Sequence, residues 1–113
     1  MIRKHYTDVE KKAVTQYGSK GTSIRVLVSD EDGAPNFVLR RFEIEPDGII
    51  GIHDHIQEHE IYILSGKGEV FNDVEIIEIN ENDVLYVPPN EPHGYRNIGK
   101  KNLIFLCTIP LLE

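Results

Sequence analysis

The stretch "HDHIQEHE", residues 53–60, is the most informative segment of this 113-residue chain, because it holds three of the five histidines. His53 and His55 are two positions apart, so in an extended strand both imidazoles leave the same face and can reach one point. His59 follows four residues later, and His93 stands downstream in the proline-rich segment "PPNEPHGYRN", residues 88–97. Imidazole is the commonest transition-metal ligand, so this grouping predicts a metal site.

Either His59 or Glu60 could supply the third ligand of such a site. Successive side chains of a strand point to opposite faces, so a slip of one residue turns a ligand away from the metal. If His59 points at the ion, Glu60 can reach it only across a bulge. Glu60 would then form an ion pair or a hydrogen bond to a ligand.

The rest of the chain has the pattern of an all-β domain. Residues 36–46 alternate, with Val38, Arg40, Phe42 and Ile44 on one face. Turn signals rich in Gly, Pro, Asn and Asp separate the strands, including "PDG" at 46–48 and a two-residue turn at 72–73. Further strands are predicted at 23–29, 60–65, 68–71, 74–79, 84–87 and 102–110. Closely spaced short strands predict a sandwich or barrel with little or no helix.

We expect a single domain over residues 1–113, with residues 1–20 as an extended N-terminal arm. Thr7 and Glu10 have the spacing of a helix capping box and Gly18 could end such a helix, but the segment between them has little apolar face to bury. The arm is therefore preferred to a helix.

Composition excludes several classes of partner. The chain has 12 Lys and Arg against 19 Asp and Glu, a net charge of −7, and its basic residues are scattered. Nucleic acid and membrane surfaces are therefore not expected as partners. No apolar run is long enough for a signal peptide or a membrane span, and the single cysteine, Cys107, allows no internal disulfide. We expect a cytoplasmic protein.

The two histidine segments resemble the two motifs of the cupin superfamily, G-x5-H-x-H-x3,4-E-x6-G and G-x5-P-x-G-x2-H-x3-N. Asparagine replaces two motif glycines, and Asn tolerates the left-handed backbone such turns require. Gly48 stands four rather than five residues before His53. The matching positions lie within residues 48–97 and are His53, His55, Gly66, Asn82, Pro88, Asn90, His93 and Asn97. The resemblance implies a small double-stranded β-helix, the cupin or jelly-roll barrel.

Counting back from Gly66 puts His59, and not Glu60, in the place of the family's glutamate ligand. The set His53, His55, His59 and His93 resembles small single-domain cupins with four histidine ligands, which implies manganese, with iron, nickel, cobalt, copper or zinc as alternatives. Four neutral ligands leave the full +2 charge on the ion, and octahedral geometry would leave two positions open.

Parity along the strands gives candidate pocket residues. Phe105, Cys107 and Ile109 share one face of the last strand, which we place inside the barrel. Cys107 is then either packing or a thiol open to oxidation near a redox centre. Arg40 is the one charged residue that alternation places inside the barrel, as a clamp for a substrate carboxylate or as half of a buried or interface ion pair. Tyr95 shares the parity of His93.

These features and the resemblance predict a mononuclear divalent-metal oxidoreductase of the dioxygenase type that acts on a small organic molecule. No catalytic base can be named from the sequence. The alternatives are a metal-dependent isomerase or decarboxylase of a sugar or keto acid, and a non-catalytic module that binds a small molecule or a metal. Phe37 and Leu39 face outward with no partner on the chain, which predicts a homodimer.

Overall fold

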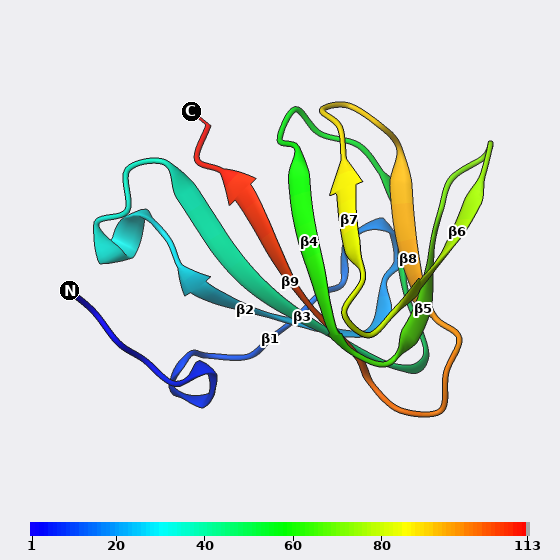
Figure 1. The fold of residues 1–113 in the computed structure, drawn as a ribbon, viewed down its shortest axis with the longest axis horizontal. Coiled ribbons are helices and arrows are strands. Elements are labelled where there is room, and N and C mark those ends of the chain that lie inside the picture. The colour runs from blue at the N-terminus through cyan, green and yellow to red at the C-terminus, as the bar shows by residue number, and fades with distance from the viewer. Residues whose placement is uncertain (113) are drawn as a thin grey trace.

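The computed structural model describes residues 1–112, which form an almost entirely β structure (Figure 1). The strands are β1 (Lys12–Ala13), β2 (Lys20–Val28), β3 (Phe37–His53), β4 (His59–Ser65), β5 (Lys67–Phe71), β6 (Ile76–Asn80), β7 (Val84–Val87), β8 (His93–Asn97) and β9 (Leu103–Pro110). Within this range the helical elements are single 3-10 turns, η1 (Tyr6–Asp8), η2 (Gln16–Gly18) and η3 (Asp30–Asp32). The predicted all-β fold class is confirmed.

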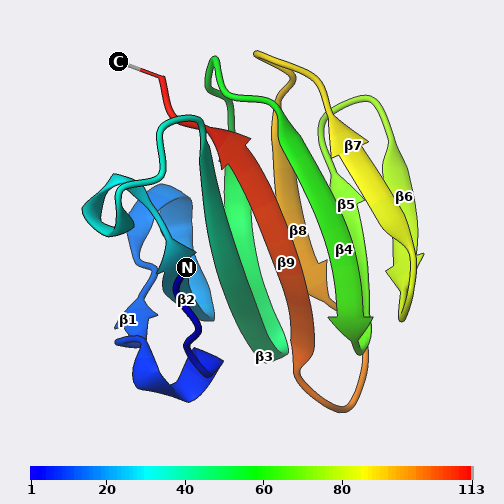
Figure 2. The ribbon, with the colours of Figure 1, turned by 60° about the vertical axis from the view of Figure 1, so that its left-hand side comes forward.

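The strands form one antiparallel sheet that curls into a nearly closed barrel, in the order β6-β5-β8-β3-β9-β4-β7 (Figure 2). β2 pairs with β3, and β1 pairs with β2. β3 joins the two halves of the barrel, because its residues 37–44 pair with β9 while His53, at its end, pairs with His93 of β8. One long strand thus pairs with β9 along its first part and ends in the histidine cluster beside β8.

The predicted turn at 46–48 is wrong, because β3 runs through it. Thr22 of β2 pairs with Ile44, whereas Lys20 pairs with Ile49, so β3 carries extra residues between these two points. Asp47 within them has a left-handed φ of 67°. Extra residues in one strand make a bulge that bends the strand without ending it.

Two shorter predictions also need correction. The loop after β5 has four residues, not two: the Asn72 N–H donates to the Glu75 carbonyl, and its side-chain oxygen accepts from the amides of Val74 and Glu75. β6 therefore begins at Ile76 rather than residue 74. β8 was not predicted as a strand, because its sequence "HGYRN" has little β-propensity of its own.

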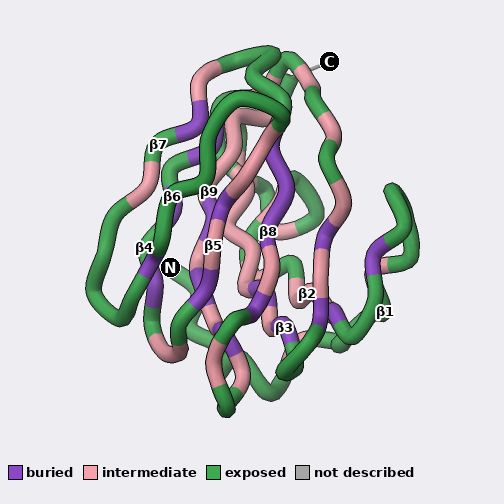
Figure 3. Tube along the Cα trace, turned by 90° about the vertical axis from the view of Figure 1, so that its right-hand side faces the viewer, coloured by how far each residue is buried: buried purple, intermediate pink, exposed green. Residues whose placement is uncertain are grey.

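The core fills the interior of the barrel, where buried and exposed residues alternate along β4 (Figure 3). Its largest fully buried side chains are Phe105, Ile44, Ile61, Ile63, Leu103 and Cys107. Burying each large apolar side chain contributes about 1.5–3 kcal/mol, so this inner face fixes the register of the strands.

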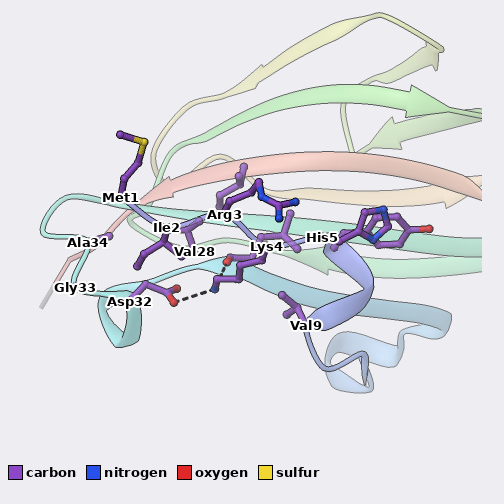
Figure 4. Close-up of a pocket in the computed structure, with 13 residues that line it drawn as sticks. Met1, Ile2, Arg3, Lys4, His5, Val9, Val28, Asp32, Gly33 and Ala34 are labelled. Carbon is purple, nitrogen blue, oxygen red and sulfur yellow. Dashed lines mark hydrogen bonds and ion pairs between the residues drawn. The ribbon is translucent and has the colours of Figure 1, made fainter.

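The N-terminal arm lies along β2 and does not form an α-helix. Lys4 Nζ donates to the Leu27 carbonyl at 2.7 Å and pairs with Asp32 at 2.9 Å (Figure 4). Leu39, which was predicted to lack a partner on the chain, is half-buried under this arm, while Phe37 stays exposed. No helix in residues 1–112 has the length and apolar character needed to cross a bilayer.

Candidate metal centre

The four candidate ligands come from three strands and one loop at the same end of the barrel. His53 ends β3, His59 begins β4, His93 begins β8, and His55 lies in the loop between β3 and β4. His93 pairs directly with His53 across the β3–β8 ladder. The amide of Asn90 donates to the His55 carbonyl at 2.8 Å, which ties the two ligand-bearing loops together.

Two left-handed turns have the residues predicted for them: Asn90 lies beside the site, whereas the Asn82 amide donates to the Ile63 carbonyl, further along β4 from His59. Asn82 and Asn90 adopt φ values of 71° and 64°. The prediction that Asn takes the place of the motif glycines is therefore confirmed.

The four imidazole rings lie together. The ring centroids are 4.4 Å apart for His53 and His93, 4.5 Å for His55 and His59, and 4.9 Å for His59 and His93. The candidate ligand atoms of His53, His55 and His93 all lie within 4.8 Å of one another. His59 joins this triad through His55, with the two Nε2 atoms 2.6 Å apart.

Backbone carbonyls fix the tautomers of two of these rings. Nδ1 of His53 donates to the Gly51 carbonyl, and Nδ1 of His93 donates to the Glu91 carbonyl, each at 2.8 Å. A carbonyl can only accept, so both Nε2 atoms carry lone pairs. The Nε2 of His93 is buried with no hydrogen-bond partner in residues 1–112. A divalent ion would satisfy it, so the donor set fits a metal.

The surroundings also keep three of the rings, those of His55, His59 and His93, neutral. Burial, with the positive charge of Arg40 as the next cause, lowers the pKa of His59 to about 2. Burial likewise lowers the pKa of His93 to about 4 and lowers the pKa of His55. These imidazoles are therefore unprotonated at neutral pH, which is the form that metal binding requires.

Glu60 does not take part in this cluster. His59 is only 3% exposed and points into the barrel, whereas Glu60 is exposed on the outer face of β4, opposite Tyr86 in the register. Successive side chains of β4 point to opposite faces, so His59 and Glu60 lie on opposite sides of the strand. Glu60 is thus neither a ligand nor a hydrogen-bond partner of one in this arrangement.

A cavity of about 420 Å³ opens onto three of the histidines, His53, His55 and His59. Its walls are mainly apolar and aromatic, with Phe42, Ile50, Tyr95 and Phe105 among them. Arg40 is the charged side chain that reaches it from β3. The cavity is large enough for an organic ligand, since small-molecule sites begin at about 300 Å³.

Residues 12–17, which we call the strap, close one side of this cavity. Tyr17 stacks on His53, with ring centroids 4.5 Å apart and planes 10° apart, and its own φ is 58°. A Cβ built at Gly51 would overlap the carbonyl oxygen of Tyr17, so glycine is needed for the strap to approach β3. Sequence reasoning missed the strap, since only Gly51 hints at it.

The predicted pocket residues are not all in the cavity. Tyr95 and Phe105 line it, whereas Ile109 packs against the core. Cys107 lies behind the wall, where its sulfur is 3.0 Å from His59 Nδ1 and 3.0 Å from Arg40 Nη2. Asn97 is structural, because its side-chain amide donates to the carbonyls of Ile44 and Lys101.

A second, larger hollow of about 660 Å³ lies between the N-terminal arm and β2 (Figure 4). None of the four clustered histidines lines it, although its lining includes Arg3 as well as Lys4 and Asp32, which pair with each other. We therefore place the functional site in the smaller cavity.

Residues 40–109 match the family model described as a cupin domain. The chain belongs to the cupin family. The matched segment carries all four clustered histidines and Arg40, so the candidate metal centre lies inside the part of the chain shared with other cupins.

Several proteins are similar to this cupin. The polyketide cyclase RemF from Streptomyces resistomycificus is 36% identical, with a TM-score of 0.90 over 97% of this chain and 79% of that chain. A predicted oxalate decarboxylase from Thermotoga maritima is 25% identical, with a TM-score of 0.86 over 98% of this chain and 100% of that chain.

A curated oxalate-binding protein from Thermotoga maritima is 36% identical over 66% of this chain and 63% of its own length. The chain spans 46% and 63% of the first two curated relatives that it matches.

Proposed function

We propose that this cupin is a metal-dependent enzyme that acts on a small organic molecule, with one divalent ion held by His53, His55, His59 and His93. The observation that carries the proposal is the buried, unpartnered Nε2 of His93 beside three other imidazoles. A buried acceptor without a partner is costly, and independent histidines have no reason to gather in this way. Manganese is the ion we propose first, by the resemblance to four-histidine cupins.

A bound divalent ion would polarise the oxygen atoms of the substrate as a Lewis acid, and a redox-active ion would in addition support dioxygen chemistry. The protein contributes the rest. Phe42, Phe105 and the strap shield the cavity from water, and Arg40 supplies a fixed positive charge. No Asp or Glu lines the cavity in residues 1–112, so the chain offers no carboxylate base there.

The absence of a carboxylate from the described lining favours Lewis-acid chemistry on a carbonyl compound, such as cyclisation or decarboxylation. The likeness to RemF, which is named a polyketide cyclase, supports this class and covers 97% of the chain. The names of the Thermotoga maritima proteins, which refer to oxalate, support a substrate with neighbouring oxygen atoms.

A dioxygenase-type oxidoreductase is the second candidate. The aromatic, strap-covered cavity favours it, because exclusion of water protects reactive intermediates. The two candidates differ in their need for a redox-active metal and for oxygen.

Metal substitution separates them. Chelator-treated protein would be reloaded with zinc or with manganese and assayed with 1,3-diketones and aromatic keto acids, with and without oxygen. Lewis-acid chemistry predicts conversion with either metal and no oxygen uptake. Oxygen uptake with manganese alone would favour the dioxygenase, and no conversion with either metal would leave a binding module. His93→Ala is the metal-free control.

A further inference from the structure

The cavity is positive although the protein is acidic. The chain carries a net charge of −7, yet the side chains that line the cavity include Lys12 and Arg40 and, within residues 1–112, no Asp or Glu. An excess of acidic residues elsewhere and none here favours an anionic ligand in this cavity.

Arg40 has hydrogen-bonding capacity that the described chain does not use. None of the ion pairs in residues 1–112 includes Arg40, so a buried ion pair within the described chain is wrong, whereas an ion pair across an interface stays a prediction. Its Nη2 donates to the weak acceptor Cys107 Sγ, its Nε is buried without a partner, and its guanidinium carbon lies 4.9 Å from the centre of the Phe42 ring. A guanidinium has five N–H donors in a planar fork suited to a carboxylate.

Tyr95 supplies a second unused donor. It is 3% exposed and lines the cavity, and its hydroxyl has no partner in residues 1–112. Arg40 and Tyr95 therefore line the same cavity, each with a donor that has no partner in residues 1–112, and together they suit one anionic group.

The walls of the cavity indicate the chemistry of the rest of the ligand, beyond its anionic group. Phe105 lies 5.2 Å from Phe42 and 5.2 Å from Tyr95 between ring centroids, so an aromatic wall runs beside Arg40. The cavity of about 420 Å³ is far larger than a two-carbon dianion such as oxalate needs. The shape and lining suit a flat, apolar body.

We infer that the ligand of this cavity is an aromatic carboxylate, whose carboxylate is bound by Arg40 and Tyr95 and whose ring lies against Phe42 and Phe105. The inference deepens the proposed function by naming its substrate class, and the residues that carry it are separate from the four histidines. It excludes oxalate as the preferred ligand, although relatives are named for it.

Isothermal titration calorimetry on chelator-treated protein tests this subsite without any metal. The probes are 2-naphthoate, the neutral 2-naphthol and oxalate. Arg40→Gln should weaken 2-naphthoate binding by at least about tenfold, since hydrogen bonds to charged groups are worth that much or more. It should leave 2-naphthol binding unchanged. Arg40→Lys, which keeps the charge without the fork, should fall between.

Arg41→Gln is the matched control, because Arg41 is the next residue of β3, pairs with Glu43 and packs over Tyr6 outside the cavity. It should not change the affinity for 2-naphthoate. Tyr95→Phe keeps the shape of the core and should weaken 2-naphthoate binding severalfold, so it carries the test if Arg40→Gln does not fold.

The inference is overturned if wild-type protein does not bind 2-naphthoate, if both Arg40→Gln and Tyr95→Phe bind it as wild type does, or if oxalate binds as tightly. Failure of the metal proposal would look different. In that case the protein would take up no ion, while 2-naphthoate binding would still depend on Arg40.

Discussion

The sulfur of Cys107 lies 3.0 Å from Nδ1 of His59. For Nε2 of His59 to bind an ion, its proton must sit on Nδ1, and Cys107 is then the acceptor that holds it there. The same sulfur accepts from Arg40 at 3.0 Å, so one thiol connects the ligand-binding arginine with a candidate metal ligand.

Cys107→Ala should lower manganese affinity by about tenfold or more, because partners that orient a ligating histidine typically contribute 10- to 100-fold. Cys107→Ser keeps an acceptor near Nδ1 and should lose less. Competition with a chromophoric chelator measures both affinities. Equal affinity in wild type and Cys107→Ala would show that the contact does not position His59.

Gly51→Ala should displace the strap, because the new Cβ would overlap the Tyr17 carbonyl. The cost should be about 1–3 kcal/mol of unfolding free energy, as for other overpacked sites, measured by urea denaturation. Gly99→Ala is the control, since the nearest atom to its Cβ would be 3.4 Å away, and it should change stability little. If both variants unfold at the wild-type urea concentration, the strap does not depend on Gly51.

Metal-free protein should lose stability on mild acidification. Unfolded histidine has a pKa of about 6.5, whereas burial lowers the pKa of His59 to about 2 and of His93 to about 4. Above pH 6.5 these histidines are neutral in both states and do not lower the free energy of unfolding. Below it, the unfolded chain binds protons that the folded protein does not, at a cost of about 1.4 kcal/mol per pH unit for each histidine.

Urea denaturation between pH 7.5 and 5 measures this slope, in a range where most carboxylates stay ionised. His93→Gln should reduce the dependence of the unfolding free energy on pH by the contribution of one histidine. A free energy of unfolding that does not change across this range would contradict the buried, neutral state of the two rings.

The homodimer stays a prediction. Phe37 is 64% exposed, and Val84 and Tyr86 on β7 are 73% and 53% exposed. Apolar side chains exposed on outer strands are common at subunit contacts. Sedimentation should give twice the chain mass at micromolar concentration, and Phe37→Ser should shift the equilibrium towards the monomer. A wild-type protein that sediments as a monomer at this concentration would contradict the predicted homodimer.

The sequence allowed prediction of what depends on local periodicity. Alternation placed His59, Phe105 and Cys107 on the inside and Glu60 on the outside, since a strand's parity is fixed once one face is buried. The resemblance to the cupin motifs put Asn82 and Asn90 in the place of turn glycines, and their left-handed φ agrees with the conformational tolerance of asparagine.

What the sequence could not give depends on contacts between distant segments. Arg40 meets Cys107 because β3 and β9 pair them across 67 positions, and Tyr17 meets His53 because the strap folds back over β3. The "PDG" segment reads locally as a turn, but pairing on both sides of it keeps it within β3.

Metal content per chain tests the central claim most directly. Protein dialysed against manganese and then against metal-free buffer should keep one ion per chain by elemental analysis. His59→Ala and His93→Ala should lose it, and Glu60→Gln, on the outer face, should keep it. Wild-type protein that retains no ion, or a Glu60→Gln variant that alone loses it, would contradict a site built from four imidazoles.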